Sequence, residues 1–277
     1  MLKTRIITAL ILAPLAIGGI FFLGPLGFAL FTGAIILLGA WEWANLAGLV
    51  PQWQRVTYAL VIGAILYLCY QPSTVVLWLA LLWWLICFFL VRSYPGTSGL
   101  WQPVAVRAVM GALVLVPAWI GLNVLRNGSP AFGDIDTGLW LIVYVFATVW
   151  VADVGAYFSG RAFGKTKLAP RVSPGKSWAG VWGGLIAVAV LAILAGQWAN
   201  AGLVEASLLV VVSVAVGLVS VLGDLLESMM KRFRGVKDSS QLLPGHGGIL
   251  DRIDSLTAAL PVFTLLAILL GWLVAGG

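Results

Sequence analysis

The chain has 277 residues, of which 61% are hydrophobic and only 9% are charged, and its mean hydropathy is +1.05. A soluble domain carries about 25% charged residues, so this composition excludes a soluble globular protein and indicates a polytopic membrane protein. The net charge of +6 favours basic cytoplasmic loops over nucleic-acid binding, because the basic residues of membrane proteins gather in cytoplasmic loops.

The apolar segments predict an all-α, polytopic integral membrane helix bundle. The N-terminal stretch MLKTRIITALILAPLAIGGIFFLG begins like a signal peptide, but no small-residue cleavage site follows, so we expect an uncleaved first span at about 6–23. A spanning helix needs roughly 20 mostly apolar residues, and about nine segments qualify, the third being the shortest. The other eight lie at about 27–49, 56–70, 74–91, 107–125, 138–158, 178–198, 204–230 and 253–275.

The basic residues predict the orientation of this bundle. With nine spans and a cytoplasmic N-terminus, all but Arg126 of the 16 Lys and Arg residues fall on the cytoplasmic side, in line with the positive-inside rule. The loops 159–177 and 231–252 are then both cytoplasmic, and one pair of spans separates them, so we expect them to meet at one membrane face. We therefore divide the chain into N-terminal transmembrane helices, 1–125, and a C-terminal transmembrane region, 126–277, which carries both loops.

The acidic residues point to the same place. Carboxylates in or beside a membrane are costly and indicate function by default. On helices, Asp224, Glu227, Ser228 and Lys231 share one face, as do Asp251 and Asp254. The alternative is simple ion pairing, of Asp224 with a neighbouring base and of Asp251 with Arg252. Six of the ten acidic residues lie in or beside the two loops: Asp153, Asp224, Glu227, Asp238, Asp251 and Asp254.

The stretch PGHGG, Pro244–Gly248, has the composition of a phosphate-binding loop. Glycine lets a backbone approach a phosphate closely, and the first N–H groups of the helix that follows attract anions. Carboxylates and phosphate oxygens are ligands that Mg²⁺ prefers. The only histidine, His246, either caps the loop or contacts metal or phosphate. Together these features predict metal-assisted chemistry on a phosphorylated substrate.

Three other features of the sequence need an interpretation. GRAFGKT is not a P-loop, because three residues separate Gly160 from Gly164 where that motif requires four. The spacing of Gly180 and Gly184 is that of a GxxxG pattern and indicates close helix packing. Glu42, near the cytoplasmic end of the second predicted span, is either a helix-packing partner or a site residue.

Two segments resemble the signature of the phosphatidate cytidylyltransferase (CDP-diacylglycerol synthase) family of bacterial type. SMMKRFRGVKDSSQLLPGHGGILDRIDS, 228–255, is similar to the family order S-x-x-K-R, K-D, P-G-H-G-G and D-R-x-D. DVGAYFSGRAFGKTKLAPRVSPGKSWAG, 153–180, is similar to a second family segment, with Ala179 where many members carry Glu or Gln. The resemblance covers mainly the half of the chain after about Asp153.

The resemblance implies that CTP and phosphatidic acid react to give CDP-diacylglycerol and pyrophosphate. It also implies dependence on Mg²⁺, a second cation such as K⁺, a homodimer, and a place in the bacterial inner membrane with the site facing the cytoplasm. The catalytic residues would be Asp224, Asp251, Lys231, Lys237 and Asp238. The metal ligands would be Asp224 and Asp251, because each lies at the membrane edge beside the glycine loop, and Asp254, which shares a helix face with Asp251, would be a weaker ligand or supporting residue. The substrate-binding residues would be Lys167, Ser173, Lys176, Ser177, Ser228, Arg232, His246, Gly247, Gly248 and Arg252.

The charges suggest how the two loops divide the work. The loop that contains PGHGG mixes acids with bases, as a metal and CTP site requires, whereas Arg161–Lys176 carries five bases and no acid. We expect the second loop to hold the lipid phosphate; the alternative is a basic surface that only touches anionic headgroups. Two other functions remain open: another membrane transferase that uses CTP or a polyprenyl phosphate, and a transporter of a phosphorylated anion.

Overall fold

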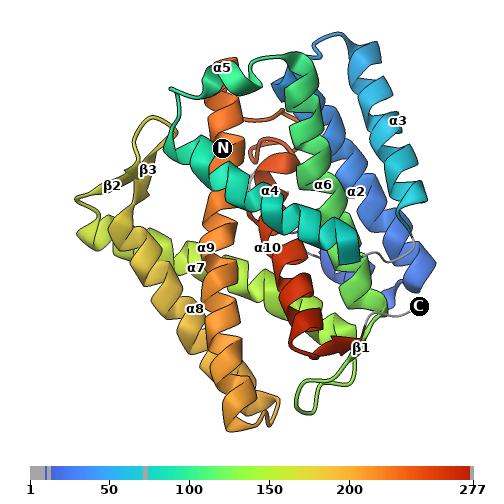
Figure 1. The fold of residues 1–277 in the computed structure, drawn as a ribbon, viewed down its shortest axis with the longest axis vertical. Helices are drawn as coiled ribbons and strands as arrows, with labels where there is room; N and C mark the ends of the chain where they lie inside the picture. The colour runs from blue at the N-terminus through green and yellow to red at the C-terminus, as the bar shows by residue number, and fades with distance from the viewer. Residues whose placement is uncertain (1–9, 11–13, 71–73, 275–277) are drawn as a thin grey trace.

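The computed structural model of the chain describes residues 10, 14–70 and 74–274, and it consists mainly of helices (Figure 1). Residues 14–22 are helical and precede α2. The helices are α2 (Pro25–Ala47), α3 (Gln52–Leu68), α4 (Thr74–Arg92), α5 (Ser98–Trp101), α6 (Val104–Asn127), α7 (Gly138–Phe163), α8 (Trp178–Trp198), α9 (Leu203–Arg234) and α10 (Leu250–Leu269). The strands are β1 (Ser129–Pro130), β2 (Lys167–Ala169), β3 (Ser173–Ser177) and β4 (Leu273–Val274).

The predicted membrane helix bundle is confirmed. Among the described residues, seven helices are long and apolar enough to span a membrane, namely α2, α4, α6, α7, α8, α9 and α10. The helix α3 has 17 residues, and the predicted first span, 6–23, lies partly outside the described residues, within which 14–22 are helical. The number nine and the cytoplasmic N-terminus therefore stay predictions. Two short antiparallel strand pairs, β1–β4 and β2–β3, were not predicted.

The helices pack in an order that brings the two halves of the chain together. Going around the bundle, α7 packs on α8, α8 on α9, α9 on α10, α10 on α6, α6 on α2, and α2 on α3. Figure 1 shows α4 and α7 crossing the other helices obliquely. The most buried of the spanning helices are α6 and α10. Many exposed Leu, Ile, Val and Trp side chains lie on α4, α7 and α8, as expected of helices that face lipid.

The predicted loop boundaries need correction at both sites. With 32 residues, α9 rises about 48 Å, well beyond the ~30 Å hydrocarbon core. It ends only at Gly235, which adopts the left-handed φ of 70° that suits a helix C-cap. Because α10 begins at Leu250, the loop between them spans 235–249. The predicted loop 159–177 contains the last turn of α7 and the β2–β3 hairpin.

Glycines explain the close contact of α7 with α8. A Cβ on Gly184 would lie 2.7 Å from the carbonyl oxygen of Ala152, and one on Gly180 would lie 3.0 Å from that of Ala156. Any larger residue at either position would push the two helices apart. The GxxxG interpretation is thereby confirmed. This packing holds α7 and α8 together next to the candidate site.

Candidate active site

The two loops meet, as the charge pattern predicted. Lys176 in β3 places its Nζ 2.6 Å from Oδ2 of Asp224 in α9. Close by, Nε of Arg232 donates a hydrogen bond of 3.2 Å to the backbone oxygen of Val172, between β2 and β3. Two polar contacts thus hold the hairpin against the C-terminal turns of α9. The site lies at the end of the bundle where α9 ends and α10 begins (Figure 1).

The hairpin positions Lys176 through its strand pairing. Lys167 is paired with Ser177, and Ala169 with Ser173. The Ser177 hydroxyl is buried and accepts a hydrogen bond of 3.2 Å from the backbone N–H of Gly180, so it caps α8. Ser177 therefore holds the start of a helix, and Lys176 is fixed one residue before it. Lys167 is exposed and Ser173 is half-buried.

The polar face predicted on α9 is confirmed. The Ser228 hydroxyl donates to Oδ1 of Asp224 at 3.1 Å, one turn apart. Lys231 places its Nζ 3.0 Å from Oε1 of Glu227, again one turn apart. Side chains four residues apart lie next to each other on a helix. Asp224 thus has a neighbour on its own helix as well as Lys176 from the hairpin.

Asp251 pairs with a different base from the one that the ion-pairing alternative named. Lys231 Nζ lies 2.6 Å from Asp251 Oδ1, whereas Arg252 is exposed. The reason is geometric, because neighbouring helix residues point in different directions and α9 lies against α10. Oδ2 of Asp251 accepts hydrogen bonds from the Ser239 N–H at 2.9 Å, the Ser239 hydroxyl at 2.9 Å and the Gly248 N–H at 2.8 Å. Asp251 therefore binds the 235–249 loop to α9.

The two glycines that end PGHGG are required by the carboxylates of the chain itself. Gly247 has a φ of 81°, and a Cβ there would lie 2.7 Å from Oδ2 of Asp251. A Cβ on Gly248 would overlap the Ser239 hydroxyl and the Glu42 carboxylate. In this structure the groups that lie against the two glycines are side chains of the protein, and the approach of a phosphate to PGHGG stays a prediction.

Glu42, whose role the sequence left open, lies against the 235–249 loop. It is fully buried. Its carboxylate accepts from the Ser239 and Ser240 hydroxyls at 3.1 and 2.6 Å, and from the Ile249 and Leu250 N–H groups at 3.0 and 2.7 Å. Its position as an acid inside an apolar helix was the only signal for it. Nothing in the sequence pointed to the two serines.

The remaining predicted residues surround this core. Lys237 and Asp238 are exposed on the loop, and Arg232 and Arg252 are exposed on the helices that flank it. His246 lies on a tight turn, in which its N–H donates to the Leu243 oxygen at 2.9 Å. Its Nδ1 is buried and has no hydrogen-bond partner among the described residues.

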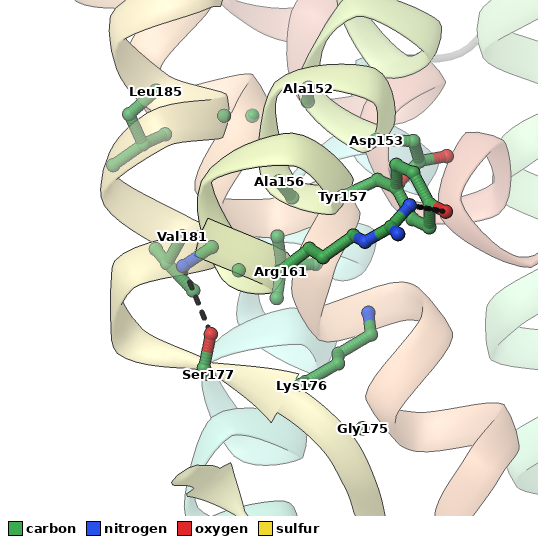
Figure 2. A pocket seen from close by; sticks show the side chains of 15 residues that line it. Ala152, Asp153, Ala156, Tyr157, Arg161, Gly175, Lys176, Ser177, Val181 and Leu185 are labelled. Carbon is green, nitrogen blue, oxygen red and sulfur yellow. Dashed lines mark hydrogen bonds between the residues drawn. The ribbon is translucent and has the colours of Figure 1, made fainter. Parts of the chain in front are cut away.

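A cavity of about 360 Å³ adjoins the hairpin between α7, α8 and α9. Figure 2 shows Asp153, Tyr157 and Arg161 along one side of it, with the Lys176 side chain pointing toward them. Tyr157 accepts a hydrogen bond of 3.4 Å from Nη1 of Arg161. The deeper wall consists of small and aliphatic residues of α7, α8 and α9, namely Ala152, Ala156, Gly180, Val181, Gly184, Leu185, Gly217 and Val221. The cavity thus combines a charged rim with an apolar interior.

Carboxylates, the ligand type that a hard cation prefers, lie beside this cavity. Asp224 and Asp254 act on each other electrostatically, and Lys176 acts on both. Asp153 interacts with Asp224 and Lys176 in the same way. Carboxylate oxygens are the ligands of Mg²⁺, and the Asp224 side chain is 28% exposed. No three His, Cys, Asp or Glu residues of the described part are grouped closely enough to form a complete site. Both oxygens of Asp251 already accept hydrogen bonds from the chain.

The chain is similar to known proteins over nearly its whole length. The model of the cytidylyltransferase family matches residues 3–270. A protein of Pseudomonas aeruginosa named phosphatidate cytidylyltransferase is 52% identical, over 98% of this chain and 99% of its own length. Proteins of the same name from Haemophilus influenzae and Brucella suis are 44% and 36% identical, over 95% and 93% of this chain and 98% and 90% of their own lengths.

Proposed function

The chain belongs to the cytidylyltransferase family, and on this premise we propose that it transfers CMP from CTP to phosphatidic acid, giving CDP-diacylglycerol and pyrophosphate. The observation that carries this proposal is similarity over nearly the whole chain to three proteins named phosphatidate cytidylyltransferase. The cluster that joins the hairpin to α9 and α10 supplies the charges that two phosphorylated substrates require. Transport of a phosphorylated anion, which the sequence left open, has no support from these relatives.

The cavity beside the hairpin is the proposed site of the lipid substrate. Arg161 and Lys176 at its rim suit the phosphate of phosphatidic acid, because guanidinium and ammonium groups bind phosphate oxygens strongly. Its small and aliphatic wall suits the first carbons of an acyl chain. This assignment agrees with the charge sorting in the sequence, where the segment Arg161–Lys176 has bases and no acids.

The 235–249 loop and its flanks are the proposed site of the CTP phosphates. Arg232, Lys237 and Arg252 are exposed around this loop, and His246 lies on a tight turn within it. Of these bases, Arg232 contacts the backbone of the hairpin that carries Lys176. CTP and the lipid phosphate would therefore be held side by side.

In the proposed reaction, a phosphate oxygen of phosphatidic acid attacks the α-phosphorus of CTP. One P–O bond forms, the bond between the α-phosphorus and the bridging oxygen breaks, and pyrophosphate leaves with the electron pair. The attacking oxygen is already anionic, so the chain does not have to supply a strong base. Its task is to hold two polyanions together and to stabilise the charge that develops on the leaving group.

Mg²⁺ is part of the proposal, with Asp224 and Asp251 as ligands and Asp254 as a weaker ligand or supporting residue. A bound Mg²⁺ neutralises phosphate charge and stabilises the leaving pyrophosphate. Lys176 and Asp224 would keep each other in place until the substrates bind, since the pair is only partly exposed. The family resemblance adds K⁺ as a second cation and a homodimer. It also adds the bacterial inner membrane, with the site on the cytoplasmic side, which the clustering of basic residues supports.

The test is release of pyrophosphate by the purified chain in neutral detergent. We expect release only when CTP, phosphatidic acid and Mg²⁺ are all present, with CDP-diacylglycerol formed in equal amount. ATP in place of CTP, and a polyprenyl phosphate in place of phosphatidic acid, are the matched controls. Release with the polyprenyl phosphate but not with phosphatidic acid would contradict the substrate that we propose.

A further inference from the structure

Glu42 connects the N-terminal half of the chain to the 235–249 loop. Its four hydrogen bonds come from Ser239 and Ser240 in the loop and from Ile249 and Leu250 at its end. A carboxylate has about four acceptor positions; Ser240, Ile249 and Leu250 each donate to Glu42, and the single hydroxyl hydrogen of Ser239 lies between Glu42 and Asp251. The ion pairs of the described residues do not include Glu42. Its charge is stabilised by neutral donors and by the N-terminal end of α10.

The same short stretch of α2 also holds the other end of the loop. Nε of Arg234, the last residue of α9, donates to the Asn45 oxygen at 3.0 Å. Nε of Arg107, at the start of α6, donates to the Ala47 oxygen at 2.8 Å. Cations at the C-terminal carbonyls of a helix are favourable. The 235–249 loop is thus attached to α2 at both of its ends, through Asn45 on one side and Glu42 on the other.

The contact from Glu42 continues to Asp251 through shared partners. The Ser239 hydroxyl lies 3.1 Å from Oε2 of Glu42 and 2.9 Å from Oδ2 of Asp251. Gly248 lies against both carboxylates, and its N–H donates to Asp251. Glu42 therefore determines where the loop backbone and the Asp251 carboxylate lie, although it is buried and has no access to substrate.

We propose that Glu42 is a positioning residue, and that α2 is a brace which holds the 235–249 loop in its substrate-binding conformation. The proposal rests on the assignment of this loop to CTP. Losing the brace then weakens CTP binding, whereas the lipid phosphate, held by the hairpin and α7, is unaffected. A purely structural role would instead affect both substrates alike.

The test compares Glu42→Gln with wild type. Glutamine has the same size as glutamate. Its NH₂ group, however, would replace one carboxylate oxygen and would face one of the loop N–H or hydroxyl donors that this oxygen now accepts from. We expect hydrogen exchange of the amides at 239 and 248–250 to become about tenfold faster. We also expect the KM for CTP to rise about tenfold, with the KM for phosphatidic acid within about twofold of wild type.

Two further variants provide the controls. Glu205→Gln changes a partly exposed carboxylate that accepts from the Gly202 N–H at 3.3 Å, and it should leave exchange and both KM values unchanged. Ser240→Ala removes the hydroxyl that donates to Glu42 at 2.6 Å, and its effect should not add to that of Glu42→Gln. Glu42→Asp keeps the charge and should restore part of the CTP affinity.

The outcomes test the brace independently of the proposed reaction. Faster loop exchange in Glu42→Gln supports the brace even if the wild-type chain turns out not to use CTP. Wild-type exchange in the folded variant overturns the brace, and an equal rise of both KM values overturns the positioning role. Should Glu42→Gln not fold, Ser240→Ala decides: about threefold faster exchange at 248–250 supports the brace, and no change overturns it.

Discussion

Lys231 lies between two carboxylates from different helices, with Nζ 2.6 Å from Oδ1 of Asp251 in α10 and 3.0 Å from Oε1 of Glu227 in α9. The ammonium group of Lys231 thus joins α9 to α10, the two helices that flank the 235–249 loop. Because Asp251 also accepts from the loop N–H groups, it has a structural task in addition to any contact with metal. Asp224 is paired instead with Lys176 of the hairpin.

The two aspartates should therefore differ when changed to asparagine. Both variants should lose activity on the order of a thousandfold, since losing a carboxylate at a transition-state metal costs several kcal/mol. Only Asp251→Asn should also speed hydrogen exchange in 235–249, because the neutral amide binds Lys231 and the loop more weakly. Exchange and turnover measured on the same samples check this. Near-normal turnover in either variant would remove that residue from the site.

Lys176→Ala should distinguish a phosphate site from a headgroup-touching surface. In neutral detergent micelles, we expect the KM for phosphatidic acid to rise or kcat to fall by about tenfold, since a charge-assisted contact is lost. Lys165→Ala, an exposed lysine of the same segment, is the matched control. If both variants behave as wild type at every phosphatidic acid concentration in micelles, the segment only touches the membrane.

The sequence predicts features that depend on neighbouring residues better than contacts between residues far apart along the chain. The span at 178–198 matches α8 residue for residue, and Asp224 shares a helix face with Lys231 as predicted, because both follow from local periodicity. The partners of Asp251 and Glu42 depend on how α2, α9 and α10 pack. Residues 42 and 250 are far apart along the chain, so no spacing rule connects them. The β2–β3 hairpin was missed because its strands are only a few residues long.

Gly248→Ala should inactivate the protein because the added Cβ would disrupt the packing of the 235–249 loop. The added Cβ would meet the Ser239 hydroxyl and the Glu42 carboxylate, so the loop must move or Glu42 must lose donors, at a cost of about 1–3 kcal/mol. We expect at least a tenfold loss of turnover and a lower unfolding temperature. Gly99→Ala, where a Cβ meets nothing within 4 Å, should match wild type. An active and stable Gly248→Ala variant would mean that the loop is not packed against Glu42.

Metal removal should stop the reaction without unfolding the bundle. With EDTA present, turnover should vanish, while the helical signal and the unfolding temperature stay near those of the untreated protein, because the contacts of Lys176 and Lys231 with the acids persist. Mg²⁺ should restore turnover, and Asp224→Asn should require about tenfold more of it. Full activity in EDTA would contradict a role for Mg²⁺.

The orientation of the chain can be tested by cysteine labelling in intact cells. Ser239 is buried, so the exposed Gln241 is the better probe of the 235–249 loop, with Thr166 for the hairpin. In a variant without Cys69 and Cys87, single cysteines at 241 and 166 should resist a membrane-impermeant maleimide until the cells are opened. A cysteine at Asp136, exposed in the segment between α6 and α7, should react at once, since the bundle places that segment at the opposite end (Figure 1). Labelling of 241 or 166 in intact cells would place the site on the outer side, where CTP is absent.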